Sequence, residues 1–421
     1  MKGIRLMMIA TAFLLALAGA GLAAGPPGAG VGASPGAGAA TVAPTAAPTA
    51  GPPGADQRDE LLRRQAVNID TTAVQRFLTE VNKTWEGYGP EITLSDFLDI
   101  YRSGEDTKYS PKAIMKGFLN YLVREVLANA GILATIIVLA VAGAILQNLQ
   151  SAFDAEATGK LAHWVVYLML VGLAITGFTI AVSAAKQVMD TLSTFMLAML
   201  PTLLTVLAAM GGITSAAIFQ PIMVTFVSTA ATVMTTIVFP LIFLSAVLDI
   251  VSGLNENFKL SGLSGLLRQG ANWTLGLTST LFLGTVAVKG VAGAVADGVT
   301  MKTAKFLFGN FVPVVGKMFS DATELIMGST VLLKNALGMV GAAAIFFIVA
   351  FPLLKIMSLV LIYQVAGALV EPMGAGPTAK MLNTMGKSLQ MIFASVAVVA
   401  LMFFVAITVI VGAGNMTVMV R

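Results

Sequence analysis

The sequence predicts an all-α, polytopic membrane protein with a small helical domain ahead of its membrane part. Of its 421 residues, 57% are hydrophobic and only 11% are charged. A soluble domain has about 25% charged residues, so this chain has too few to cover a water-soluble globule of its size. Its apolar residues also gather in runs longer than the roughly 20 residues that a membrane-crossing helix needs. The lipid bilayer is therefore the predicted surroundings of most of the chain.

Composition also excludes several classes of protein. The formal net charge is +4 and the Lys and Arg residues are scattered, so a nucleic-acid partner is not expected. The chain has no cysteine and one histidine, His163, which removes thiol chemistry and most transition-metal sites. We therefore expect no enzyme activity, no cofactor and no metal ion. His163 borders an apolar run, where it either packs at the membrane interface or relays protons.

The first 24 residues have the three-part pattern of a signal peptide. Lys2 and Arg5 precede a short apolar run that ends in small residues, with cleavage expected between Ala20 and Ala24. The alternative is an uncleaved membrane anchor, although the run is short for a full crossing. Residues 25–55 consist almost wholly of Gly, Ala, Pro, Thr and Val, and they predict a flexible linker.

Residues 56–126 have the composition of a small soluble domain. Apolar residues recur at helical spacing in residues 71–81 and 94–101, each near a residue that favours a helix start. A signal peptide ahead of this domain places it outside the cytoplasm, where we expect it to contact other proteins. Residues 110–127 are amphipathic with Pro111 in the first turn, and we expect them to lie along the membrane surface.

Residues 127–421 form the predicted multi-pass membrane domain, with about eight crossings. Residues 127–153 and 161–185 contain no charged residue, and each predicts one crossing. The charge-free run of residues 191–248 would be about 87 Å long as a helix, far more than the roughly 30 Å of the hydrocarbon layer. It must therefore break, at Gly211-Gly212, and kink or break again near Pro240. Further crossings are expected at residues 272–297, 326–348, 350–370 and 388–413, with a tight connection at 371–377.

Two patterns in the membrane domain leave alternatives open. Positive residues both precede and follow the crossing at 272–297, so the positive-inside rule does not assign the side of the C-terminus. Residues 161–253 and 270–370 share four short sequence features in the same order, here called the shared marks. They are an Ala-X-Trp triplet, then Asp190 or Asp297, then Pro201 or Pro313, then Phe-Pro-Leu. These marks indicate either an internal repeat of the kind found in transporters or a coincidence within apolar sequence.

Charged residues inside the apolar runs are the candidate functional residues, because a charge in lipid is costly and persists only when it is paired, hydrated or facing a cavity. Lys355, within the run at 350–370, is the clearest candidate. Charges near the ends of runs either line a pathway or reach the interface and pair structurally. These residues are Asp249, Lys289, Asp297, Glu324 and Lys334.

The segment of residues 303–324 interrupts an apolar stretch with three residues that disfavour a helix and three charges. They are Gly309, Pro313, Gly316, Lys317, Asp321 and Glu324. The glycine spacing does not match a phosphate-binding loop. We expect a broken or re-entrant membrane segment with its charges at a hydrated end, beside a conducting path. The alternative is a straight helix followed by an ordinary surface loop.

Several stretches of the sequence resemble one known family. They are GILATIIVLAVAGAILQNLQSAF, DGVTMKTAKFLFGNFVPVVGKMFSDATE, VLLKNALGMVG, EPMGAGP and VGAGNMTVMV. These stretches are similar to stage III sporulation protein AE of endospore-forming bacteria, and the similarity runs from about residue 66 to the C-terminus. The Gly/Ala/Pro-rich linker departs from the family pattern.

The resemblance implies a membrane-embedded component of the channel, or secretion-like, complex that joins mother cell and forespore during endospore formation. It implies a place in the mother-cell membrane around the forespore, with other stage III sporulation membrane proteins as partners. Any ATPase that drives such a complex would be a separate subunit. The family is permease-like and brings no catalytic residues. Two alternatives stay open: an autonomous permease-like secondary transporter, and a non-conducting membrane scaffold.

Overall fold

The described part of the protein is almost entirely helical. The computed structural model describes residues 111–153, 156–254, 260–311, 315–373 and 376–419, together with Gln75, Arg76, Thr79, Asn82 and Lys83. No strand occurs among these residues, which confirms the predicted all-α class. The expected signal peptide, the linker and most of the small N-terminal domain lie outside the described residues.

Ten helical elements follow one another in this part of the chain. They are α5 (Pro111–Ala128), α6 (Ala130–Phe153), α7 (Glu156–Ala209), α8 (Ile213–Val233), the π-helical η1 (Met234–Val238), α9 (Phe239–Leu254), α10 (Ser261–Phe311), α11 (Val315–Val370), the 3₁₀ turn η2 (Glu371–Met373) and α12 (Gly376–Met419). The η2 turn and the start of α12 confirm the tight connection expected at residues 371–377.

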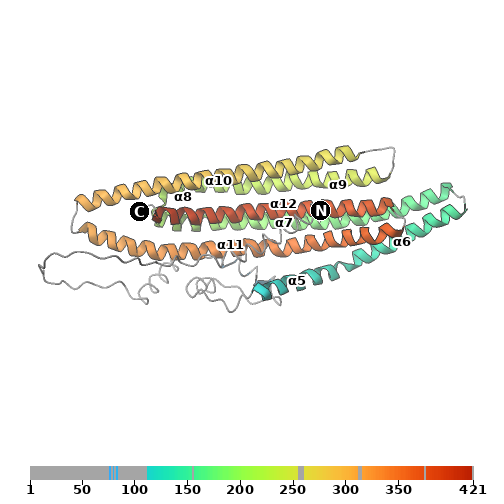
Figure 1. The fold of residues 1–421 in the computed structure, drawn as a ribbon, viewed down its shortest axis with the longest axis horizontal. Coiled ribbons are helices and arrows are strands. Elements are labelled where there is room, and N and C mark those ends of the chain that lie inside the picture. Colours follow the sequence, from blue (N-terminus) through green and yellow to red (C-terminus); the bar gives the residue numbers. More distant parts are fainter. Residues whose placement is uncertain are drawn as a thin grey trace, which may run out of the picture.

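The long helices run side by side along one axis, with their connections alternating between the two ends of the bundle (Figure 1). Helix α12 packs against α11, α10, α7 and α9 and so forms the centre of the bundle. Helices α7 and α11 contain 54 and 56 residues. At a rise of 1.5 Å per residue each is roughly 80 Å long, more than twice the thickness of the hydrocarbon layer.

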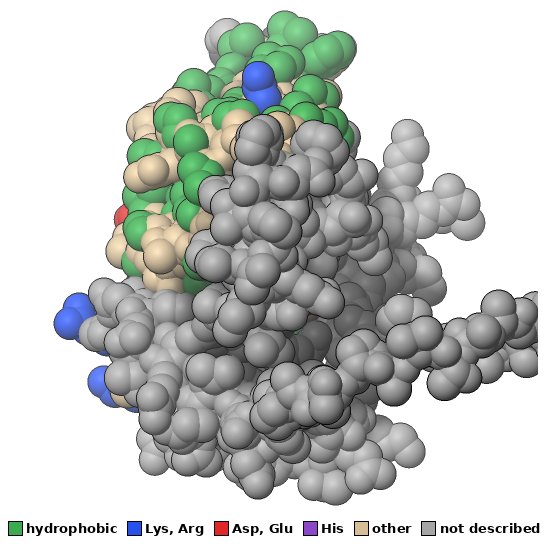
Figure 2. Space-filling model, turned by 90° about the vertical axis from the view of Figure 1, so that its left-hand side faces the viewer, with side chains coloured by type: hydrophobic (Ala, Val, Ile, Leu, Met, Phe, Trp, Pro, Cys, Tyr) green, Lys and Arg blue, Asp and Glu red, His purple; other side chains and the backbone are tan. Residues whose placement is uncertain are grey.

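The outer surface of the bundle is largely apolar. On α10, Trp273 is 71% exposed, Leu277 62% and Val288 66%. Figure 2 views the bundle from the left-hand end of Figure 1, and hydrophobic side chains dominate its upper part, where α10 lies. Large apolar side chains exposed over a surface of this size are expected where a protein faces lipid.

The expected count of eight crossings is not confirmed. Within the described residues, five helical segments are long and apolar enough to cross a membrane, or six if the bent pair α5–α6 is one span. The five are Trp164–Ala209, Ile213–Gly253, Ser261–Thr300, Lys334–Met373 and Gly376–Ala413. The α5–α6 pair is bent by 45°.

Two pairs of expected crossings are halves of single helices. The runs at 161–185 and from 191 onward are joined in α7 through residues 186–190, which were expected to separate them. The runs at 326–348 and 350–370 are joined in α11, with Pro352 inside the helix. Residues 186–190 contain good helix formers, and a proline inside a membrane helix is tolerated where neighbouring helices pack around it.

The break predicted at Gly211-Gly212 is confirmed. The N–H of Gly211 donates to the Ala208 carbonyl at 2.9 Å, and the N–H of Gly212 donates to the Leu207 carbonyl at 3.0 Å. This pattern is the Schellman ending of a helix, and Gly211 has the positive φ of 88° that it requires. A Cβ on Gly212 would lie 2.9 Å from the Leu207 carbonyl oxygen, so both glycines are needed where α7 turns back into α8.

The irregularity predicted near Pro240 is a π-helical turn and not a break. Element η1 ends directly before Phe239, whose N–H donates to the Met234 carbonyl five residues back. A proline lacks an N–H and displaces the preceding turn, and a π turn absorbs that change without ending the helix. The segment Ile213–Gly253 therefore remains one candidate span.

The amphipathic segment expected along the membrane surface is α5, and it packs against α11. The Phe118 ring lies 5.5 Å from the Phe346 ring and 5.9 Å from the Phe351 ring, measured between centroids. The Tyr121 ring lies 4.9 Å from that of Phe351. The aromatic face of α5 therefore covers a neighbouring helix of the bundle.

The candidate internal repeat gains no support from the fold. Both of its halves form helical hairpins, α7 with α8–α9 and α10 with α11. The shared marks nevertheless fall in different places. The Phe-Pro-Leu stretch at 239–241 begins α9, whereas the one at 351–353 lies inside α11. Asp190 is exposed, whereas Asp297 is buried.

Candidate functional site: a polar groove beside Lys355

Lys355 lies near the middle of the candidate span Lys334–Met373 and faces an open groove between α11 and α7. The groove has a volume of about 470 Å³. Its lining consists of Ile175, Thr176, Thr179, Ile180, Ser183, Ala184 and Gln187 of α7 together with Lys355 of α11. The clearest charged candidate of the sequence is thus opposite a row of hydroxyl and amide groups.

The groove presents several polar groups within a lining that is otherwise apolar. The hydroxyl groups of Thr176 and Thr179 donate to the carbonyls of Gly172 and Ile175, both at 2.9 Å, so their oxygen lone pairs are left for other donors. Among the described residues no carboxylate forms an ion pair with Lys355. An ammonium group in a membrane-spanning helix needs water or a counter-charge. The open groove gives water access to Lys355 and leaves room for an anionic group.

A close contact between α7 and α11 fixes the walls of the groove. The hydroxyl of the buried Tyr363 on α11 donates to the carbonyls of Leu173 and Ala174 on α7, at 3.2 and 3.3 Å. Gly177 on α7 makes room for this ring, because a Cβ there would lie 2.1 Å from the Tyr363 hydroxyl oxygen. The glycine and the tyrosine together set the distance between the two helices.

Asp297 has a structural role at the start of α8. Its carboxylate is 1% exposed and accepts the backbone N–H groups of Thr214 and Ser215, at 2.8 and 2.9 Å. These N–H groups lie in the first turn of α8, where no helical carbonyl can reach them. Gly293, one turn earlier on α10, permits the approach, since a Cβ there would lie 2.7 Å from the Ser215 hydroxyl oxygen. A side chain of α10 thus caps α8.

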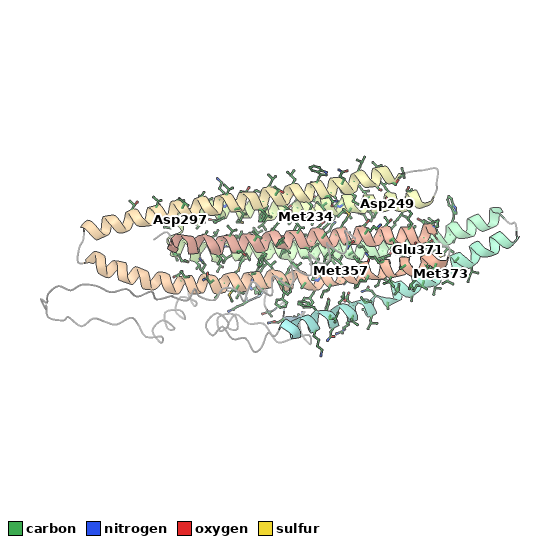
Figure 3. All side chains as sticks on the ribbon, viewed as in Figure 1. Met234, Asp249, Asp297, Met357, Glu371 and Met373 are labelled. Atoms are coloured by element: carbon green, nitrogen blue, oxygen red, sulfur yellow. The ribbon has the colours of Figure 1, made fainter. Side chains whose placement is uncertain are left out.

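Asp249 joins α9 to α10 toward the end of the bundle opposite to Asp297, as the labelled positions of the two residues in Figure 3 show. Its carboxylate accepts hydrogen bonds from the Ser264 hydroxyl and from the Arg268 guanidinium, the latter at 2.6 Å. The Ser245 hydroxyl donates to the Ser264 carbonyl at 2.9 Å. A partly exposed ion pair of this kind contributes up to about 1 kcal/mol, so Asp249 supports the hairpin instead of lining the groove.

The other predicted charges do not meet Lys355 in the described structure. Lys289 is exposed on α10, and Lys334 is fully buried on α11. Gly309 lies in α10 and Gly316 in α11, whereas the side chains of Lys317, Asp321, Glu324 and His163 and the whole of Pro313 lie outside the described part. Helix α10 ends at Phe311 and α11 begins at Val315, and residues 312–314 lie outside the described part. A re-entrant segment there stays a prediction.

The α7 wall of the groove was not predicted from the sequence. Thr176, Thr179, Ser183 and Gln187 recur at intervals of three or four residues, which places them on one face of a helix. This spacing was the available signal, but these uncharged residues were counted as part of an apolar run. Within the described residues, no group of three or more His, Asp or Glu side chains could hold a metal ion.

Comparisons with known proteins point to one family. The family model described as stage III sporulation protein AE matches residues 92–414 of the chain. The stage III sporulation protein AE of Bacillus subtilis (strain 168) is 40% identical over 367 residues, which cover 87% of this chain and 92% of that relative. No solved structure matches the chain significantly.

Proposed function

The chain belongs to the stage III sporulation protein AE family, and we propose that it is a membrane-embedded component of the channel complex between mother cell and forespore. In this proposal it works in a secretion-like assembly during endospore formation. The main support is the open polar groove beside Lys355, in a bundle whose outer surface is largely apolar. A protein that only anchors partners in lipid has no need of a cation and a hydroxyl row near the middle of its spans.

The proposal assigns the chain no catalytic step. Its polar side chains line a groove that suits passage or binding of a hydrophilic solute. Any ATPase that drives the complex is a separate subunit. The groove and its supporting contacts lie in α7 and α11, within the region that matches the family model.

The proposed location is the mother-cell membrane around the forespore. The signal-peptide pattern of residues 1–24 would export residues 56–126, which would then face the space between the two membranes. There this domain would contact other stage III sporulation membrane proteins. The family match begins at residue 92, so part of the domain belongs to the conserved architecture of the family model.

An autonomous permease-like transporter is the second candidate. The groove is formed within a single chain, between α7 and α11, and this observation favours a protein that could move a solute without partners. The transporter should work when it is reconstituted alone in lipid vesicles, whereas the complex component should require its partners. A pure scaffold should tolerate the loss of the Lys355 charge.

Co-purification from sporulating cells tests membership of the complex. The affinity-tagged full-length protein, extracted in mild detergent after engulfment, should bring down other stage III sporulation membrane proteins. A tagged membrane protein of similar size and unrelated function serves as the control. Recovery of the chain without any envelope partner, under conditions that keep its own fold, would remove the complex from the proposal and leave the transporter.

The two ends of the membrane domain are predicted to lie on the same side. With α5–α6 as one span, the described residues cross the membrane six times, which is an even number. A reporter that is active only in the cytoplasm should therefore be silent both when inserted near residue 60 and when fused after Arg421. The same reporter in the α7–α8 turn tests the side reached by α7. Opposite signals from the two end positions would show that α5–α6 does not cross.

A further inference from the structure

The exposed side of α7 is polar over most of its length. Between residues 172 and 209, every exposed residue is Gly, Ala, Pro, Thr, Ser, Gln, Lys or Asp, and none is a large apolar residue. The most polar part comprises Thr176, Thr179, Ser183, Lys186, Gln187 and Asp190. This side of α7, here called the polar face, contrasts with α10, where Leu277, Leu281 and Val288 are exposed.

Helix α8 carries a second row of exposed hydroxyl groups. It consists of Thr225, Ser228, Thr229 and Thr232, and Thr236 in the following η1 continues it, at intervals of at most four residues. Helices α7 and α8 pack together as an antiparallel hairpin about the Gly211-Gly212 turn. Thr194 and Ser228 are each 17 residues from Gly211, and Asp190 and Thr232 are each 21 residues from it. The two polar rows therefore lie at matching heights along the bundle.

The charges on the polar face and in the Lys355 groove lie in the middle of long apolar helices. Lys186 is at the centre of the candidate span Trp164–Ala209, and Lys355 is near the centre of Lys334–Met373. Each charge placed against lipid at the bilayer centre costs at least about 2.5 kcal/mol. Neither Lys186 nor Asp190 forms an ion pair within the described residues. Lipid is therefore not a suitable neighbour for this face.

We propose that the polar face of α7, continued by the hydroxyl row of α8 and by the Lys355 groove, borders water inside the membrane and forms one wall of a hydrophilic passage. Water satisfies the lone pairs that Thr176 and Thr179 present outward, and it hydrates Lys186, Asp190 and Lys355. That this wall belongs to a passage rests on the proposed function. The contact with water stands independently, on the exposure and spacing of these residues.

Single-cysteine labelling tests this proposal on the full-length protein in membranes of sporulating cells. The chain has no cysteine, so each variant carries one thiol. Thr176→Cys, Ser183→Cys and Thr194→Cys sample the polar face and Thr229→Cys samples α8, all with small changes of shape. Leu277→Cys and Leu281→Cys are matched controls on the exposed apolar side of α10, and Ala181→Cys is a buried control.

The three polar-face variants and Thr229→Cys should react with a charged, water-soluble maleimide, and the α10 and buried variants should not. The charged reagent does not enter hydrocarbon, so we expect its rates with the two groups of thiols to differ by about tenfold or more. An uncharged maleimide should label the exposed variants of α7, α8 and α10 alike. This labelling would confirm that the α10 thiols are accessible from lipid. Labelling of the polar face should persist whether or not the other complex members are present.

Two results would overturn the proposal. Labelling of the polar face by the uncharged maleimide alone would mean that it faces lipid. Labelling by the charged reagent only after partner proteins are removed would mean that a protein covers it.

The failure of the proposed function can be distinguished from the failure of this proposal. If no partners co-purify but the polar face still reacts, the passage belongs to an autonomous transporter. If partners co-purify and the face does not react, the chain is in the complex without lining a passage.

Discussion

Asp297→Ala should lower the free energy of unfolding by roughly 2–4 kcal/mol, one of the two largest stability effects we expect from a single substitution. The change removes the only carboxylate that accepts the N–H groups of Thr214 and Ser215 among the described residues. The N–H of Ser215 then stays buried without an acceptor at the start of α8, and the half-buried N–H of Thr214 loses its partner as well. Thermal unfolding of the purified protein in detergent measures the loss as a lower melting temperature.

Two companion variants make this result specific. Asp297→Asn keeps one carbonyl oxygen in place and should cost only about 1 kcal/mol. Asp190→Ala removes an exposed carboxylate and should change the stability by no more than about 0.5 kcal/mol. Equal melting temperatures for Asp297→Ala and Asp190→Ala would show that the cap does not hold α8 in place.

Gly177→Ala should destabilise the protein by about 1–3 kcal/mol, because the new methyl group has no space between α7 and α11. Its Cβ would lie 2.1 Å from the hydroxyl oxygen of Tyr363, so one of the two helices must shift. Gly172→Ala is the matched control one and a half turns away, where nothing lies within 4 Å of the added Cβ. That change should be neutral or slightly stabilising, since alanine favours a helix more than glycine does.

The tyrosine provides an internal check on this contact. Tyr363→Phe alone loses the hydrogen bonds to α7 and should cost about 1 kcal/mol. Combined with Gly177→Ala, it removes the clashing oxygen, so the double variant should be more stable than the sum of the two single losses predicts. Strictly additive losses would mean that the methyl group and the hydroxyl do not meet.

The fold class and one helix break could be predicted because simple physical limits govern them. A chain with so few charges cannot cover itself in water, and a charge-free run of about 87 Å cannot cross a 30 Å layer once. That excess length, together with two adjacent glycines, located the turn at Gly211-Gly212. The expected number of crossings was not confirmed for a related reason. Residues 186–190, which contain Lys186 and Asp190, and residue 349 were taken as boundaries between crossings, yet they lie inside continuous helices.

The site was only partly predictable because the roles of single charges depend on tertiary neighbours. Lys355 was selected as a functional candidate because a lysine within an apolar run has few structural uses, and it lines the groove between α7 and α11. Asp297 was selected by the same rule but caps a helix that is more than 80 residues earlier in the sequence. The polar face of α7 was missed because a charge count ignores threonine and serine. A search for polar residues at helical spacing would have found it.

Lys355 is the residue on which the proposed function depends most, and spore formation measures its role directly. Cells whose only copy of the protein carries Lys355→Met should form heat-resistant spores at a yield lowered about tenfold or more. Lys355→Arg keeps the positive charge and should retain most of the yield. Lys289→Met removes an exposed lysine of α10, away from the groove, and should leave the yield unchanged. Each variant should accumulate in the membrane and co-purify with partners as the original protein does. A normal spore yield from Lys355→Met, at normal protein level, would contradict the claim that the polar groove is where this protein works.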